Sequence, residues 1–207
     1  MQLDILKSHI HASIQFAASD DIRYYLNSVY IETGARGALL IATNGHILSV
    51  ARIHAEPLPE SNIIIPRSMV EKIKAPKKGN PCVTLTYDDT GEKREITLKD
   101  GDSQVSMIEV DGKYPDWRRV IPDSLTGETA CYDFKYLACC QKAAEILGNR
   151  YCAILHNGNS PGVVDFSNDG FMAIVMPMRG NTDAKGWAVP EWTGKTPIEK
   201  PSLQMVA

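Results

Sequence analysis

The sequence predicts an α+β fold in which antiparallel sheets carry short helices on one face. Apolar strand-like segments outnumber helical ones, and tight turns rich in Gly, Asp and Asn join them. The same order, a short helix followed by a run of strands, occurs three times along the 207 residues. We call these repeats units 1, 2 and 3. An apolar content of 43% is enough for a packed core in one or two domains.

Unit 1 combines a helical pattern with a hairpin signal. Ile10 and Ile14 lie at helical spacing, and Ser8 is a suitable N-cap. Asn44-Gly45 between apolar runs is typical of a two-residue hairpin in which both turn residues take positive φ. The expected elements are residues 3–6 (a short strand or the start of the helix), a helix over 8–18, and strands over 23–32, 38–42 and 47–53.

Units 2 and 3 have the same order of elements. In unit 2, Met69, Val70 and Ile73 form the apolar side of a short helix that Pro76 ends. In unit 3, a longer helix ends at Gly148. The expected elements are a strand over 62–66, a helix over 67–74 and strands over 82–87, 94–99 and 104–109 in unit 2, then a strand over 128–133, a helix over 134–147 and strands over 152–156, 162–167 and 172–177 in unit 3. Residues 181–207 have no periodicity and are expected to form a tail, with Trp187 and Trp192 able to fold over a neighbouring surface.

Composition excludes several classes of protein. No apolar run approaches the roughly 18 residues of a membrane span, and the N-terminus lacks the features of a signal peptide. The net charge of −3 argues against wholesale phosphate neutralisation, so any DNA contact must use a local basic face. The five cysteines have no paired metal-ligand spacing and are expected to be reduced thiols of a cytoplasmic protein without a metal. They are Cys82, Cys131, Cys139, Cys140 and Cys152.

Signals for catalysis are weak. His9 and His11 point apart on the expected helix, and the acidic pair Asp100 and Asp102 lies where turns favour aspartate anyway. No glycine-rich phosphate cradle is present. We therefore expect no catalytic residues and no cofactor, and an enzyme of unknown class ranks below the two binding functions given below.

Four stretches, in one fixed order, are more specific than any of these features. They are Asp21-Ile22-Arg23-Tyr24-Tyr25-Leu26-Asn27, Ala42-Thr43-Asn44-Gly45-His46, Asp111-Gly112-Lys113-Tyr114-Pro115-Asp116-Trp117-Arg118-Arg119-Val120-Ile121-Pro122 and Val175-Met176-Pro177-Met178-Arg179. Together they resemble the bacterial sliding clamp family, the beta subunit of DNA polymerase III. The chain looks like a shortened member of that family.

The resemblance divides the chain. Residues 1–122 resemble the middle domain of the family, and residues 123–180 resemble about half of its last domain, with 123–168 matched only by the pattern of elements. Residues 181–207 extend past the point where family chains stop. The family's first domain is absent.

The resemblance implies a DNA-clamp-like fold whose helices line a central hole. It implies a non-catalytic processivity factor that tethers a DNA polymerase or a related DNA enzyme to duplex DNA, with clamp-loader-type proteins as further partners. Family rings contain twelve units, so four chains of three units would close a homo-oligomeric ring, and head-to-tail contacts are expected. The alternative is a clamp-like module that does not encircle DNA and regulates replication by binding clamp partners or the host clamp.

Two sets of site residues follow from the resemblance. A pocket for partner peptides maps onto Leu26, Thr43, Gly45, His46, Leu48, Pro122, Ile174, Val175, Met176, Pro177 and Met178. Basic residues on or beside the helices are expected to face DNA: Arg67, Lys72, Lys74, Lys77, Lys78, Lys135 and Lys142. Lys7, His9, His11 and Gln15 are further polar groups that the first helix offers to that face. Lysines spread over several helices suit sequence-blind phosphate contact, although a solvated helix face gives the same pattern.

Overall fold

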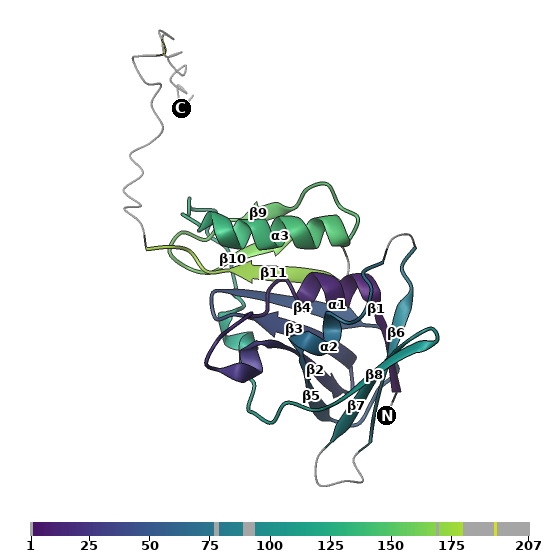
Figure 1. Cartoon of the computed structure of the whole chain (residues 1–207). Coiled ribbons are helices and arrows are strands. Elements are labelled where there is room, and N and C mark those ends of the chain that lie inside the picture. Colours follow the sequence, from purple (N-terminus) through teal and green to yellow (C-terminus); the bar gives the residue numbers. More distant parts are fainter. Residues whose placement is uncertain (1, 77–78, 89–93, 169, 180–192, 194–207) are drawn as a thin grey trace.

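The computed structural model describes residues 2–76, 79–88, 94–168, 170–179 and 193. In these residues, eleven strands form two antiparallel sheets, and the helices pack on one face of the larger one (Figure 1). This arrangement confirms the predicted α+β class. No described helix is long and apolar enough to cross a membrane.

Units 1 and 2 complete each other's sheets. Unit 1 contains β1 (Gln2–Leu6), α1 (Lys7–Ser13), β2 (Ser28–Gly34), β3 (Gly37–Thr43) and β4 (Ile47–Ile53). Unit 2 contains β5 (Ser61–Pro66), α2 (Arg67–Val70), β6 (Cys82–Asp88), β7 (Glu95–Asp100) and β8 (Ser103–Ile108). The opening strand of each unit pairs with the other unit, β1 with β6 and β5 with β2. This reciprocal exchange relates the two units by a local two-fold.

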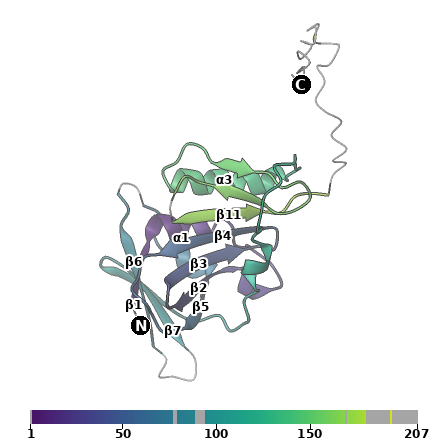
Figure 2. The same ribbon diagram turned by 180° about the vertical axis from the view of Figure 1, so that it is seen from behind.

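Unit 3 extends the larger sheet. It contains α3 (Phe134–Ile146), β9 (Ala153–Leu155), β10 (Gly162–Asp165) and β11 (Phe171–Val175). β11 pairs antiparallel with β4, which gives a seven-stranded sheet in the order β5-β2-β3-β4-β11-β10-β9. The smaller sheet has the order β1-β6-β7-β8. Figure 2 shows the larger sheet from behind, with β11 beside β4.

Two hydrophobic clusters lie on opposite faces of the seven-stranded sheet. The larger one packs the helices against both sheets and includes Ile10 of α1, Met69 of α2 and Cys140 of α3. The smaller one covers the face opposite the helices, which we call the outer face. It includes Leu48 and Ile174, which are paired across β4 and β11. A segment over residues 110–121 packs on this outer face, and its chief apolar anchors are Tyr114 and Trp117.

Several predicted elements are wrong in extent. α1 starts at Lys7 and has no side-chain cap, because the apolar Leu6 is its N-cap residue; Ser8 lies within the helix and donates to Asn80. α1 ends at Ser13 and α2 at Val70, since the following amides bond three residues back, as Ile73 does to Val70. A 3₁₀ turn, η1 (Tyr24–Leu26), precedes β2 in place of a continuous strand.

The predicted strand over residues 128–133 is absent. Its backbone bonds to separate loops: the Gly158 amide donates to Glu128, and the Met178 amide donates to Cys131. Residues 181–192 and 194–207, with Trp187 and Trp192, lie outside the described part of the chain, as do Lys77 and Lys78.

Candidate functional site

An apolar pocket lies on the outer face of the seven-stranded sheet, where β4 meets β11. It has a volume of about 160 Å³, which is close to the ~150 Å³ cavity that holds one benzene ring. The pocket therefore accommodates about one large apolar side chain at a time. Its walls come from three separate parts of the chain: Arg23, Tyr25, Leu26, Thr43, Gly45, His46, Ile47, Leu48, Pro115, Asp116, Trp117, Val120, Ile174 and Met176.

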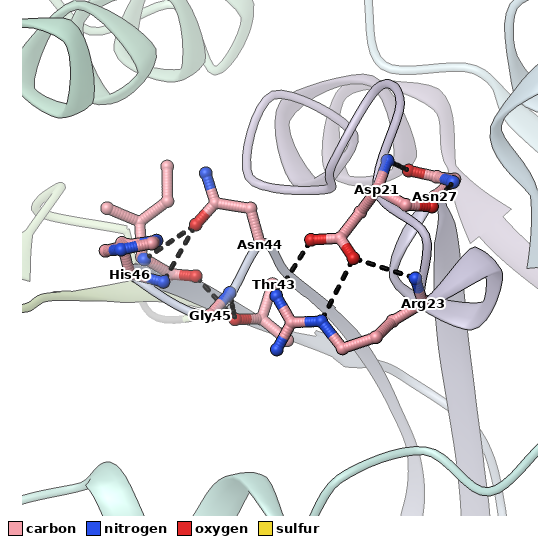
Figure 3. Close-up of polar contacts among 8 residues, drawn as sticks. Asp21, Arg23, Asn27, Thr43, Asn44, Gly45 and His46 are labelled. Atoms are coloured by element: carbon pink, nitrogen blue, oxygen red, sulfur yellow. Dashed lines mark hydrogen bonds and ion pairs between the residues drawn. The ribbon is translucent and has the colours of Figure 1, made fainter.

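The turn between β3 and β4 forms one wall. The Asn44 carboxamide oxygen accepts from the His46 and Ile47 amides at 2.9 and 3.0 Å, and the Thr43 hydroxyl accepts from the Gly45 amide at 3.0 Å (Figure 3). Gly45 has φ +89°, whereas Asn44 is not in the left-handed region. The prediction of two positive φ angles was therefore wrong: the turn spans three residues, and Asn44 stabilises it through its side chain.

A second polar network fixes the loop before η1. The Asp21 carboxylate accepts from the Arg23 amide at 2.8 Å and pairs with the Arg23 guanidinium, also at 2.8 Å (Figure 3). These hydrogen bonds from Arg23 lower the pKa of Asp21 to about 2. Asn27 joins the other side of the loop, exchanging two 2.9 Å bonds with the backbone of Asp21. The loop thus holds Arg23 and Leu26 at the pocket.

The segment over residues 110–121 closes the remaining side. Tyr114 stacks on Tyr30 with ring centroids 4.5 Å apart, and its hydroxyl accepts from the Thr43 amide at 3.1 Å. Burial raises the pKa of Tyr114, so the phenol stays neutral. Arg118 binds both carboxylate oxygens of Glu32 and lies over the Trp117 ring. Those hydrogen bonds lower the pKa of Glu32.

A short helix explains why Trp117 reaches the pocket. The 3₁₀ helix η2 (Trp117–Val120) places residues i and i+3 on the same side, so Trp117 and Val120 both face the sheet. Trp117 is 7% exposed and belongs to the outer hydrophobic cluster.

Seven of the eleven predicted pocket residues line this pocket: Leu26, Thr43, Gly45, His46, Leu48, Ile174 and Met176. Val175 has its side chain in the core on the opposite face of the sheet, as strand alternation requires. Pro122, Pro177 and Met178 are not among the lining residues. Met178 is exposed beyond β11, and its amide donates to Cys131.

The prediction missed seven lining residues: Arg23, Tyr25, Ile47, Pro115, Asp116, Trp117 and Val120. Six of them stand in two of the four motifs, 21–27 and 111–122, so the signal was present. The positions were missed because the side-chain direction depends on the η1 and η2 turns, which strand periodicity does not reveal.

The predicted DNA-facing residues differ in their surroundings. Lys72, Lys74 and Lys142 are exposed, and Lys142 lies near Cys139, as Arg67 does. Lys135 is exposed but pairs with the helix-capping carboxylate of Asp133 at 3.1 Å and lies over the Tyr136 ring. Lys72, Lys74 and Lys142 are therefore the clearest exposed cations of this set.

The Arg67 side chain forms hydrogen bonds within the protein. Its guanidinium donates to the carbonyls of Ile14, Ala17 and Ala18 at 2.7 to 3.1 Å, and also pairs with Glu71. These carbonyls follow the end of α1, so Arg67 ties α2 to the chain after α1.

Helix α1 does not offer a polar face. All of its residues are buried, including Lys7, His9 and His11. Lys7 forms an ion pair with Asp100 at 2.7 Å, and burial lowers the pKa of both histidines. The expectation that Lys7, His9 and His11 present themselves to DNA is wrong for this chain, and Gln15 just beyond the helix is half-buried and donates to the His11 carbonyl.

Within the described residues, no group of three or more His, Cys, Asp or Glu side chains is placed to hold a metal ion. The described cysteines are free thiols, and burial raises the pKa of Cys140 to about 12. A thiol with that pKa is a poor nucleophile and a poor metal ligand at neutral pH.

Comparisons with known proteins identify the family of the chain. Residues 1–116 match the family model for the DNA polymerase III beta subunit, central domain. The beta sliding clamp of Escherichia coli K12 is 30% identical over 119 residues, which are 56% of this chain and 31% of that protein. The clamp of Salmonella typhimurium is 33% identical over 113 residues, or 53% of this chain and 30% of that one. The chain thus spans about a third of the length of these curated relatives.

Solved structures show the same fold over more of the chain. The DnaN sliding clamp from Pseudomonas aeruginosa bound to griselimycin superposes with a TM-score of 0.65 at 19% identity, covering 86% of this chain and 65% of that one. The DNA polymerase III subunit beta from Borrelia burgdorferi, in complex with a natural product, gives 0.69 at 15% identity, covering 86% and 64%. The resemblance and the clamp-like fold expected from the four motifs are confirmed. The chain belongs to the bacterial sliding clamp family, the beta subunits of DNA polymerase III.

Proposed function

We propose that this chain is a shortened, non-catalytic clamp that tethers a DNA polymerase or a related DNA enzyme to duplex DNA. The observation that carries the proposal is the pocket at the β4–β11 junction, which brings apolar walls from three separate parts of the chain into one hollow. An extended partner peptide with an apolar anchor fits such a hollow, and Arg23 and Asp116 supply polar groups at its rim.

Contact with DNA is assigned to the helix side. Lys72, Lys74 and Lys142 are exposed there, on or beside two different helices. Loose phosphate contacts of this kind carry no sequence information, and processivity comes from a closed ring that leaves DNA only by opening. Clamp-loader-type proteins are the expected partners for placing such a ring on DNA.

The test is retention on DNA of different topology. The chain is incubated with nicked circular plasmid, and bound protein is separated by gel filtration at about 0.15 M salt. We expect protein to stay with the circle and to be lost after the circle is cut at one site. Equal retention on circular and linear DNA would contradict encirclement.

A non-encircling regulator is the second candidate. It is favoured by one observation: in the described residues, units 2 and 3 each end in an edge strand, β8 and β9, so the three units in the order 2-1-3 form an unclosed row, or arc. Ligand binding at the pocket without any retention on circular DNA would favour this function over the ring.

Met176→Asp is expected to weaken ligand binding at the pocket at least 30-fold, because a carboxylate replaces an apolar wall and would be desolvated by the ligand. Griselimycin, the compound in the Pseudomonas aeruginosa clamp structure, is the probe, and calorimetric titration is the measurement. Met178→Asp is the matched control: it makes the same change two residues later, on an exposed side chain outside the pocket. Equal affinities of the two variants would remove the pocket from the proposal.

A further inference from the structure

Within the described residues, unit 3 has an open face where units 1 and 2 have a partner. The first strand after the helix, β2 in unit 1 and β6 in unit 2, is paired on both sides. Among the strands that the structure describes, the equivalent strand β9 is at the end of its sheet and pairs with β10 alone. Unit 3 also lacks the second unit that completes its sheet by donating an opening strand.

The open face is apolar and hollowed. A groove of about 260 Å³ runs between α3 and β9 and is lined mainly by Leu137, Cys140, Ala144, Tyr151, Cys152 and Ile154. In unit 1 the corresponding space is filled by β5 and α2 of unit 2, whose Ile63, Ile65, Met69 and Val70 are all fully buried. The surface beside the helix and the strand after it is therefore buried in unit 1 and exposed in unit 3.

Exposed apolar side chains gather in unit 3. Eight large apolar side chains are exposed in the described part of the chain, and five of them lie between residues 125 and 178. Tyr151 is 78% exposed and Phe134 is 84% exposed. Large exposed apolar groups beside an unpaired strand edge are typical of a surface that another chain covers.

The two junctions already present in the chain identify the partner. Units 1 and 2 exchange opening strands reciprocally, and units 1 and 3 pair their last strands antiparallel. Each junction is a local two-fold that reverses the direction of the unit, so units 2 and 3 point the same way, opposite to unit 1. A head-to-tail neighbour would place unit 3 beside a unit 2 of the same direction, which neither junction permits.

We propose that the open face of unit 3, formed by α3, Tyr151 and β9, binds the same face of a second copy of this chain across a two-fold axis. Two half domains from two chains then complete one another as units 1 and 2 do within one chain. The contact is isologous, so a single patch is self-complementary. This inference rests on the repeat alone and does not require DNA tethering.

The proposed ring would need a second contact at the β8 edge. The other end of the arc, the free edge of β8, would pair with β8 of another copy, as β4 pairs with β11. Four chains with two kinds of two-fold contact would close a ring of twelve units, in place of the head-to-tail contacts expected from the sequence. Because in-plane two-folds exchange the two sides of a ring, pockets would open on both sides, two on each.

Light scattering of five full-length proteins tests the inference: the parent, three single variants and one double variant. Tyr151→Lys places a charge on the unit 3 face, and Ile108→Lys places one on the β8 edge, where Ile108 is 53% exposed. Ile22→Lys makes the same change at a 98% exposed side chain in the loop before η1 and is the control. These side chains are exposed, so the melting temperature of each variant should stay within a few degrees of the parent.

We expect the Ile108→Lys chain to be a dimer through unit 3 and the Tyr151→Lys, Ile108→Lys double variant to be a monomer, while Ile22→Lys matches the parent. An unchanged dimer in the double variant, or a parent that stays monomeric up to about 100 µM, would overturn the inference. So would monomers for both single variants that form a dimer on mixing, because that outcome requires the unit 3 face to bind the β8 edge head-to-tail. Loss of DNA retention with the dimer intact would count against the ring only.

Discussion

Arg67→Ala is expected to lower the free energy of unfolding by about 3 kcal/mol. The side chain is 22% exposed and donates to three carbonyls that follow α1, and a hydrogen bond to a charged group contributes about 1.5–3 kcal/mol net of exchange with water. Alanine leaves these carbonyls without the donor and removes the link between α1 and α2. Urea denaturation followed by circular dichroism measures the change.

Two controls separate the structural role of Arg67 from a role in DNA contact. Arg67→Lys keeps the charge but replaces a planar, multi-donor group, so an intermediate loss of stability is expected. Lys72→Ala removes an exposed cation and should change stability by no more than about 0.5 kcal/mol. If Arg67→Ala were as stable as the parent but bound DNA more weakly, the carbonyl contacts would not be the main role of Arg67.

Arg67 also shows what periodicity does and does not predict. The sequence correctly places it at the start of a helix, directly after a strand. The assignment to the DNA face assumed that α2 extends to Lys74, which would align Arg67, Glu71 and Lys74 on one side. α2 stops at Val70, because the amides of Lys72 and Ile73 bond three residues back in a tightened turn.

The pocket was predictable in its location but not in all of its residues. The four motifs bring together the loop before η1, the β3–β4 turn, η2 and the end of β11, as expected from the resemblance. Strand alternation separates Ile174 and Met176 from Val175, and a list of consecutive residues cannot reflect that. Trp117 depends on a 3₁₀ turn whose only local signal is the motif itself.

Unit 3 was predicted correctly in its helix and its three later strands, within one or two residues. The opening strand was wrong, since an isolated extended segment forms a strand only where a neighbouring edge accepts it. In units 1 and 2 that edge belongs to the partner unit. In the described part of the chain, unit 3 has no such partner unit, so the segment over 128–133 bonds to loops instead.

Reversing three charges on the helix side should reduce DNA affinity several-hundred-fold at 0.1 M salt. The variant carries Lys72→Glu, Lys74→Glu and Lys142→Glu, all exposed positions in the structure. Each phosphate contact contributes about 0.9 to the slope of log K against log salt, so three lost contacts lower that slope by about 2.7 and affinity falls accordingly. Fluorescence anisotropy with a labelled duplex, measured from about 50 to 200 mM salt, gives both quantities.

Net charge alone could weaken binding, so the control has the same charge and a different location. Lys99→Glu, Lys113→Glu and Arg119→Glu change exposed residues of β7 and of the 110–121 segment, and this variant has the same formal net charge of −9, six below the parent's −3. Long-range repulsion should reduce affinity in both variants. Only the helix-side variant loses direct phosphate contacts, so only in that variant should the slope of log K against log salt become smaller. If both slopes fall equally, these lysines act through overall charge. If neither slope changes, the helix side does not face the phosphates, and the DNA-tethering function must be assigned to another surface.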